Sequence, residues 1–255
     1  MSVMQKFSLE GRVALVTGGN RGIGRGIAQA LAEAGAAVAI TARTAQAAQD
    51  AAAELTAEGH TALGVALDVT DADSVESAVA EVEVALGPID VLINNAGISI
   101  GGAALEIDDD VWTQTLDTNL NGVWRCSRAV GRRMAERGGG TIVNIGSMSA
   151  MIVNQPRWQP AYLASKAAVH QLTKALAAEW AAHSIRVNAM APGYILTEAS
   201  PVDQPEYYAS CVEPAAMKRW GTPEELGAVA VFLASEASSF MTGSVLVVDG
   251  GYTLF

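Results

Sequence analysis

A tyrosine and a lysine four residues apart, preceded by two serines, are the residues of this chain best suited to chemistry. They lie in the stretch 146–166, whose sequence is GSMSAMIVNQPRWQPAYLASK. Tyr162 and Lys166 fall on a segment predicted to be helical, so their spacing puts both side chains on one face. The alternative is an ordinary pair on a solvated helix, and the rest of the sequence decides between the two.

A tyrosine can act as a base near neutral pH only if its pKa falls. The usual phenol pKa is about 10, and lowering it by about three units requires roughly 4 kcal/mol of preferential stabilisation of the phenolate. An ammonium group about 4 Å away supplies roughly that amount at an effective dielectric of about 20. We therefore expect Lys166 to lower the pKa of Tyr162, and a serine hydroxyl to hold a substrate oxygen by hydrogen bonding.

The elements that must position these groups follow from a regular alternation along the chain. Short β-branched runs alternate with longer Ala-rich segments, which predicts alternating strands and helices. The predicted strands are 12–17, 36–41, 62–66, 89–93, 141–145, 185–190 and 245–248. The predicted helices are one that ends at Leu31, then 46–58, 71–86, 109–137 and 161–182. Parallel strands need crossover connections, and these cover both faces of a sheet. The sequence therefore predicts one α/β domain over residues 1–255, a Rossmann-like doubly wound parallel sheet of about seven strands.

The stretch 192–221 interrupts this alternation. It is too long for a simple connector, which favours a substrate lid. The alternative is an ordered surface loop with a short helix, and the sequence leaves both open.

A glycine-rich turn joins the first predicted strand to the first predicted helix, with the sequence TGGNRGIG over residues 17–24. Glycines let the chain turn tightly and let a pyrophosphate approach the backbone, while the helix N-terminus offers unpaired N–H groups. The position of the turn favours a dinucleotide site over a merely structural turn. The expected cofactor-binding residues of this turn are Gly18, Asn20, Arg21, Gly22, Ile23 and Gly24.

Two further segments lie where the third and fourth strands should end. Ligands of such sheets bind beyond the carboxyl ends of the strands. We therefore expect the adenine and the ribose of the dinucleotide to contact Asp68, Val69, Asn95, Ala96 and Gly97. For Asp68 the alternative is a helix cap on the segment that begins near Asp71.

These motifs occur together in the order and spacing of a known family. TGGNRGIG, NNAG, Asn119, a serine after the fifth strand, YLASK and Pro192-Gly193 resemble the short-chain dehydrogenase/reductase family from about Leu9 to the last residues. The resemblance implies hydride transfer between NAD or NADP and an alcohol/carbonyl pair. It further implies that Tyr162 is the acid/base, that Lys166 lowers its pKa and contacts the nicotinamide ribose, and that Asn119 supports a water-linked proton path. The same resemblance implies that the segment 192–197 binds the carboxamide and the pyrophosphate of the cofactor. Its expected contacts are Pro192, Gly193, Ile195 and Thr197.

The position of the catalytic serine differs from the usual family pattern. Family members typically place it thirteen residues before the tyrosine, which indicates Ser149, whereas alignment on the end of the strand indicates Ser147, fifteen before. The serine must sit where the strand leaves the sheet, and the loop absorbs two extra residues at small entropic cost. We therefore favour Ser147, with Ser149 as a substrate contact.

The enlarged loop resembles that of family members acting on polyols and ketoses, such as galactitol, sorbitol and gluconate dehydrogenases. Its amide side chains suit hydroxylated substrates, and the alternative is a loop with solvent-facing amides. The expected substrate contacts are Ser149, Asn154, Gln155, Trp158 and Tyr194.

The end of the second strand bears on the choice of cofactor. Members that prefer NAD place an acidic residue there to bind the ribose hydroxyls, and residues 40–43 offer none. Arg43, with Arg21 from the glycine turn, can instead bind a 2′-phosphate through charge-assisted hydrogen bonds. The sequence therefore favours NADP over NAD, and surface arginines are the alternative.

The amino-acid composition excludes some classes of binding partner. The net charge of −11 argues against nucleic-acid and anionic-membrane partners, which need clustered basic residues. No apolar run is long enough to span a membrane, and neither cysteine nor histidine spacing indicates a metal site. We expect a cytoplasmic enzyme that acts on small molecules, and the resemblance implies a homotetramer.

Other functions are compatible with the same fold. A 3-oxoacyl thioester reductase shares much of the framework, and a nucleotide-binding regulator would carry the catalytic groups as vestiges. An epimerase that retains its cofactor is a third alternative function. The joint presence of Asn119, Ser147, Tyr162 and Lys166 favours the oxidoreductase.

Overall fold

A parallel sheet of seven strands forms the centre of the computed structural model, which describes residues 2–255. The strands are β1 (Val13–Val16), β2 (Ala37–Ala42), β3 (Ala62–Ala66), β4 (Ile89–Asn94), β5 (Gly140–Ile145), β6 (Ile185–Pro192) and β7 (Val245–Val248). Their order is β3-β2-β1-β4-β5-β6-β7, and each neighbouring pair is parallel. The predicted doubly wound α/β fold is thus confirmed. The order of the strands reverses between β1 and β4, where ligands of such sheets bind.

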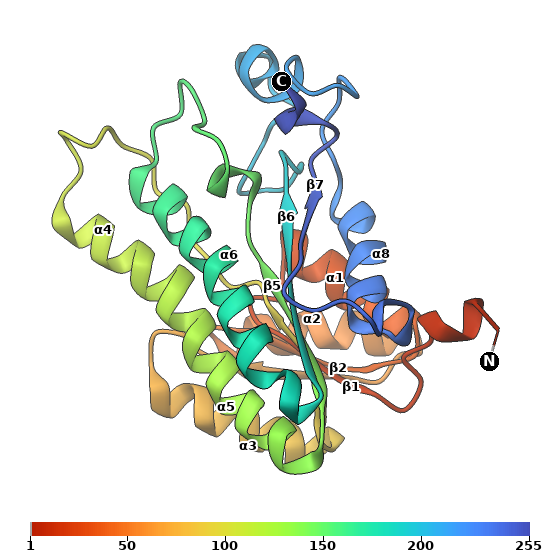
Figure 1. Ribbon diagram of the computed structural model, residues 1–255. Helices are drawn as coiled ribbons and strands as arrows, with labels where there is room; N and C mark the ends of the chain where they lie inside the picture. The colour runs from red at the N-terminus through yellow and green to blue at the C-terminus, as the bar shows by residue number, and fades with distance from the viewer. Residues whose placement is uncertain (1) are drawn as a thin grey trace.

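Helices cover both faces of this sheet (Figure 1). They are α1 (Gly22–Glu33), α2 (Ala45–Ala57), α3 (Ala72–Leu86), α4 (Asp109–Leu116), α5 (Gly122–Arg137), α6 (Pro160–Trp180), α7 (Pro205–Tyr207) and α8 (Pro223–Ala234). Short 3-10 turns are η1 (Met4–Phe7), η3 (Met148–Ala150), η4 (Ala181–His183), η6 (Glu236–Ser238) and η7 (Tyr252–Leu254), and π-helical turns are η2 (Asp117–Asn121) and η5 (Tyr208–Val212). Within residues 2–255, no helix combines the length and apolar character that crossing a membrane requires.

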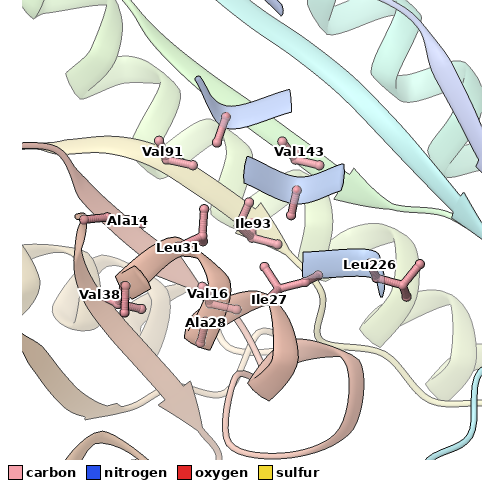
Figure 2. Close-up of a cluster of buried hydrophobic side chains, with 14 of the residues drawn as sticks. Ala14, Val16, Ile27, Ala28, Leu31, Val38, Val91, Ile93, Val143 and Leu226 are labelled. Carbon is pink, nitrogen blue, oxygen red and sulfur yellow. The ribbon is translucent and has the colours of Figure 1, made fainter. Parts of the chain in front are cut away.

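Two hydrophobic cores lie on opposite faces of the sheet because successive strand residues point to opposite sides. On β1, Ala14 and Val16 contribute to the core under α1, α2 and α8 (Figure 2), whereas Val13 and Leu15 contribute to the core under α3, α5 and α6. Parallel strands buried on both faces explain why their sequences are continuously apolar. The sheet therefore holds the residues at the carboxyl ends of its strands in fixed positions.

Two helical features differ from the sequence-based expectation. The helix predicted over 109–137 is continuous in direction but contains the π-helical turn η2 at its centre, at Asp117–Asn121. Helix α8 was not predicted; it begins with a capping box between Thr222 and Glu225. The stretch 192–221 holds α7 and η5, and Figure 1 shows it near the C-terminus, beyond the ends of β6 and β7.

Candidate active site

A cavity of about 620 Å³ lies along the carboxyl edge of the sheet. Its lining contains most of the residues that the sequence singles out: Gly18, Asn20, Arg21, Gly22, Ile23, Gly24, Arg43, Asp68, Val69, Asn95, Ala96, Gly97, Ser147, Ser149, Asn154, Tyr162, Lys166, Pro192, Gly193, Tyr194, Ile195 and Thr197. Three others do not line it: Asn119, Gln155 and Trp158. The fold therefore brings the dinucleotide motif and the tyrosine-lysine pair, distant in sequence, to one continuous space.

The glycine turn is held close to the end of β4. A Cβ on Gly24 would lie 2.3 Å from the carbonyl oxygen of Gly18 and 2.4 Å from Nδ2 of Asn95, so only glycine fits. Nδ2 of Asn95 donates hydrogen bonds to the carbonyl oxygens of Thr17 and Gly18, at 3.0 and 2.9 Å. The Asn95 side chain thus braces the turn, a structural use that the sequence analysis did not foresee.

Helix α1 begins at the cavity without a side-chain cap. The residue before it, Arg21, is extended and makes no capping hydrogen bond. The N–H groups of the first turn have no acceptor within the helix. A pyrophosphate satisfies such groups and the positive end of the helix dipole. The turn therefore fits a dinucleotide.

The end of β3 presents a hydrogen-bonded carboxylate. Oδ1 of Asp68 accepts hydrogen bonds from Oγ1 and the backbone N–H of Thr70, at 2.7 and 2.9 Å. These bonds hold the pKa of Asp68 below its usual range, and the bond from the Thr70 side chain has the larger effect. The N-cap of α3 is Asp71, so the capping alternative for Asp68 is wrong. Asp68 remains an ionised group at the cavity wall.

Two arginines stand at the dinucleotide end of the cavity. Arg21 and Arg43 are exposed, and neither makes an ion pair of 4.0 Å or less with any carboxylate of residues 2–255. Their guanidinium groups are therefore available to an anionic ligand.

At the other end of the cavity, Ser147 follows the last strand residue, Ile145, after a single glycine. A Cβ on that glycine, Gly146, would lie 2.2 Å from Nε2 of His170, so the chain leaves β5 in close contact with α6. The Ser147 hydroxyl accepts a hydrogen bond from the backbone N–H of Ser149 at 3.1 Å, and it lies close enough to the Tyr162 phenol to lower the pKa of that group. The structure thus pairs Ser147, rather than Ser149, with the tyrosine.

Lys166 is buried beneath this pair. Its Nζ donates a 2.7 Å hydrogen bond to the carbonyl oxygen of Ile145 and lies 5.7 Å from the centre of the Tyr162 ring. Burial lowers the pKa of Lys166 to about 8. Because this pKa still lies above neutral pH, the Lys166 ammonium carries positive charge in most molecules.

The electrostatics of Tyr162 differ from the expectation. Burial raises the pKa of Tyr162, and only a hydrogen bond to Ser147 and the charge of Arg157 oppose this rise. Desolvation of the phenolate outweighs these attractions because the charged form loses its hydration. In the protein alone Tyr162 is therefore a neutral proton donor.

Asn119 lies in the π-helical turn η2, behind the cavity wall. Its Oδ1 accepts from the backbone N–H of Ile98 at 2.8 Å, and its Nδ2 donates to the Ile98 carbonyl at 2.9 Å and to Oγ of Ser165 at 3.1 Å. A Cβ on Gly97 would lie 3.2 Å from this Oδ1 and 3.7 Å from Nζ of Lys166. Asn119 thus fixes the chain beside the lysine without reaching the cavity, and π-helical turns are frequent at functional sites.

The loop 151–159 lines the cavity through only one of its three expected residues, Asn154. Nδ2 of Asn154 donates a 3.0 Å hydrogen bond to the Tyr194 hydroxyl, and both residues line the cavity. Gln155 is exposed outside it, and Trp158, which is 48% exposed, borders a separate cavity of about 370 Å³. These two residues, predicted as substrate contacts, therefore do not line the main cavity.

Two residues of the same loop were missed. Arg157 and Gln159 line the main cavity, and Gln159 accepts a 3.1 Å hydrogen bond from Oγ of Ser99. The only signal in the sequence was the charge of Arg157 among amide residues. Among residues 2–255, no group of three or more histidine, cysteine or acidic side chains is arranged to hold a metal ion.

Comparisons with known proteins agree over nearly the whole chain. A family model described as enoyl-(acyl carrier protein) reductase matches residues 18–253. The chain is 48% identical over 251 residues to a galactitol 2-dehydrogenase (L-tagatose-forming) of Cereibacter sphaeroides, covering 98% of each chain. Its structure resembles that of a short-chain type dehydrogenase/reductase from Mycobacterium marinum, with a TM-score of 0.95, 44% identity and 99% of each chain covered. It also resembles a gluconate 5-dehydrogenase from Burkholderia cenocepacia in complex with NADP and tartrate, with a TM-score of 0.95, 39% identity and 100% of each chain covered.

Proposed function

Because the chain belongs to the short-chain dehydrogenase/reductase family, we propose that it transfers hydride between a nicotinamide dinucleotide and a secondary alcohol or ketone of a polyol or ketose. One observation carries the proposal. The neighbouring side chains of Ser147 and Tyr162, with Lys166 beside them, line the same cavity as the uncapped glycine turn. The relatives named for galactitol and gluconate support the substrate class.

Proton transfer is the part of this reaction that the chain itself performs. The substrate oxygen accepts or donates a hydrogen bond at the Ser147 hydroxyl and at Oη of Tyr162. During oxidation Oη takes the proton of the substrate hydroxyl, and during reduction it gives a proton to the oxygen of the former carbonyl. The dinucleotide, when bound, accepts or supplies the hydride. Because Oη is the group that exchanges the proton, a phenylalanine at this position removes the acid and the base together.

The remaining groups act on Tyr162 and on the cofactor. Lys166 contributes positive charge 5.7 Å from the phenol ring and is the donor we assign to the nicotinamide ribose. Asn119 supports a water-linked proton path, consistent with its place beside Gly97 and Lys166. We assign the carboxamide and the pyrophosphate of the cofactor to Pro192, Gly193, Ile195 and Thr197. The support for this assignment is that all four residues line the cavity.

We propose NADP as the preferred cofactor. Arg43 and Arg21 are two guanidinium groups without carboxylate partners among residues 2–255, at the end of β2 and before α1. A 2′-phosphate supplies their counter-charge through bidentate hydrogen bonds. The solved gluconate 5-dehydrogenase bound to NADP agrees with this preference.

The stretch 192–221 is proposed as a substrate lid, and a homotetramer as the assembly. The lid packs around a small core of its own, made by Val202, Cys211 and Val212, while its first residues line the cavity. For the assembly, the partly exposed Trp112 and Trp124 on α4 and α5 offer apolar surface to a second copy. The two free cysteines agree with a reducing cytoplasm.

A spectrophotometric screen tests the proposed function. We expect consumption or production of reduced nicotinamide with at least one polyol, ketose or sugar acid, faster than with a 3-oxoacyl thioester. Tyr162→Phe should lower kcat about 10²- to 10⁴-fold while the protein still binds the cofactor. Cofactor binding without turnover of any substrate would support the regulator instead, and full activity of Tyr162→Phe would contradict the mechanism.

A further inference from the structure

Arg157 is a cation at the substrate end of the cavity without a carboxylate partner. Its guanidinium lies 5.3 Å from the centre of the Tyr207 ring, and NH1 is 4.0 Å from Sγ of Cys211. Six other arginines form ion pairs, but Arg157 forms none of 4.0 Å or less with any residue of 2–255. Its side chain is nevertheless only partly exposed. A partly buried charge without a counter-ion is unfavourable, which indicates that a ligand supplies one.

Other charged groups line the cavity, and three of them stand at its dinucleotide end. Arg21 and Arg43 stand there with Asp68, as described above. Two other carboxylates line the cavity: Asp117, which is ion-paired with Arg125 at 2.8 Å, and Glu198, which directly follows Thr197. The cations left at the catalytic end are Lys166 and Arg157.

A second unsatisfied group lies in the same loop. Oδ1 of Asn154 is buried without a hydrogen-bond partner, while Nδ2 of this residue is engaged by Tyr194. An unpaired buried acceptor calls for a donor, and a substrate hydroxyl is one. The loop thus offers an acceptor for a hydroxyl and a fork of N–H donors for an anion.

We propose that Arg157 binds the carboxylate of a sugar acid, so that the enzyme acts on aldonates and their keto forms in preference to neutral polyols. A guanidinium binds a carboxylate through two parallel hydrogen bonds, whereas a terminal hydroxyl offers it only one weak acceptor. This inference rests on the proposed function and narrows its substrate. Arg157 is a specificity residue in this proposal and takes no part in proton transfer.

The competing explanation is structural, because Arg157 also stacks on Tyr207 at the start of the segment 205–212. A latch of this kind would affect every substrate alike. The ratio of kcat/KM between an acidic and a neutral substrate separates the two explanations, since a latch leaves that ratio unchanged.

The matched probes are D-gluconate and D-sorbitol, which differ only in the terminal carboxylate. We expect the wild-type enzyme to oxidise D-gluconate with the higher kcat/KM. Arg157→Gln should lower the ratio of the two kcat/KM values about ten- to hundredfold, mainly through KM for D-gluconate. Arg157→Lys keeps the charge and should retain an intermediate ratio. Lys6→Gln removes the same charge from the exposed turn η1 and should leave the ratio at its wild-type value.

The outcomes separate the inference from the proposed function. A wild-type enzyme that oxidises D-sorbitol with the higher kcat/KM, or an Arg157→Gln enzyme with an unchanged ratio, overturns the inference alone. A wild-type enzyme that turns over neither probe nor any other polyol, ketose or sugar acid overturns the proposed function, and the inference falls with it. A melting temperature of Arg157→Gln equal to that of the wild type, with the lowered ratio, excludes the latch.

Discussion

Nζ of Lys166 donates a 2.7 Å hydrogen bond to the carbonyl oxygen of Ile145, the last residue of β5. This bond joins helix α6 to the point where the chain leaves the sheet, so the position of the lysine depends on the strand. Tyr162 lies one helical turn before Lys166, and Ser147 lies two residues after Ile145. The same contact therefore holds the serine near the tyrosine, whose pKa the Ser147 hydroxyl lowers.

Replacing each serine by alanine distinguishes their roles. Ser147→Ala removes the hydroxyl that lowers the pKa of Tyr162 and would hold the substrate oxygen, and we expect kcat to fall about 10²- to 10³-fold. Ser149 contacts Ser147 through its backbone N–H, which alanine keeps, so Ser149→Ala should cost less than about tenfold. Steady-state kcat on the best substrate of the screen measures both. Loss of turnover in Ser149→Ala alone would reverse the assignment.

Arg43 tests the preference for NADP. Arg43→Ala should lower kcat/KM for NADPH about ten- to hundredfold because a charge-assisted hydrogen bond to the 2′-phosphate is lost. The value for NADH, which lacks this phosphate, should change little. Arg128→Ala, at an exposed arginine of α5 that does not line the cavity, is the control. Equal losses with both cofactors would contradict a role in binding the phosphate.

Gly24 tests the close approach within the dinucleotide turn. Alanine there would place its Cβ 2.3 Å from the Gly18 carbonyl oxygen, so Gly24→Ala must displace the turn. We expect the free energy of unfolding to fall by about 1–3 kcal/mol and cofactor affinity to fall with it. Gly101→Ala is the matched control, because its nearest contact would be an ordinary 3.8 Å. Wild-type stability and affinity in Gly24→Ala would show that the turn adapts.

His170 should give the protein a pH-dependent stability. Burial first, then the charges of Lys166 and Lys174, lowers the pKa of His170 from 6.5 to about 4. Between pH 6.5 and about 4, His170 therefore binds a proton in the unfolded chain but not in the folded protein. The free energy of unfolding contributed by this group is fully present above pH 6.5 and is lost as the pH falls toward 4.

The measurement is urea unfolding of the wild type and His170→Leu across this range. The wild type should lose about 1.4 kcal/mol per pH unit relative to the variant. Parallel curves for the two proteins would mean that His170 already takes up its proton in the folded state.

The sequence by itself determined the features that depend on neighbours along the chain. The strands of the sheet follow from local apolar runs, and β3 has the predicted bounds 62–66. Tyr162 and Lys166 share a face because the geometry of one helix fixes residues four apart. The glycine turn was recognisable because its conformation is set by the residues within it.

Only the tertiary structure decided which loop side chains reach the cavity. Arg157 and Gln159 line it and Trp158 does not, because contacts with a distant segment orient this loop. The backbone N–H of Gly102 donates to the Trp158 carbonyl at 2.9 Å, and Ser99 binds Gln159. A loop has no periodicity that would fix the direction of a side chain, so long-range hydrogen bonds set it. The pairing of Ser147 with Tyr162 and the bracing role of Asn95 have the same origin, since each joins residues from different elements of the fold.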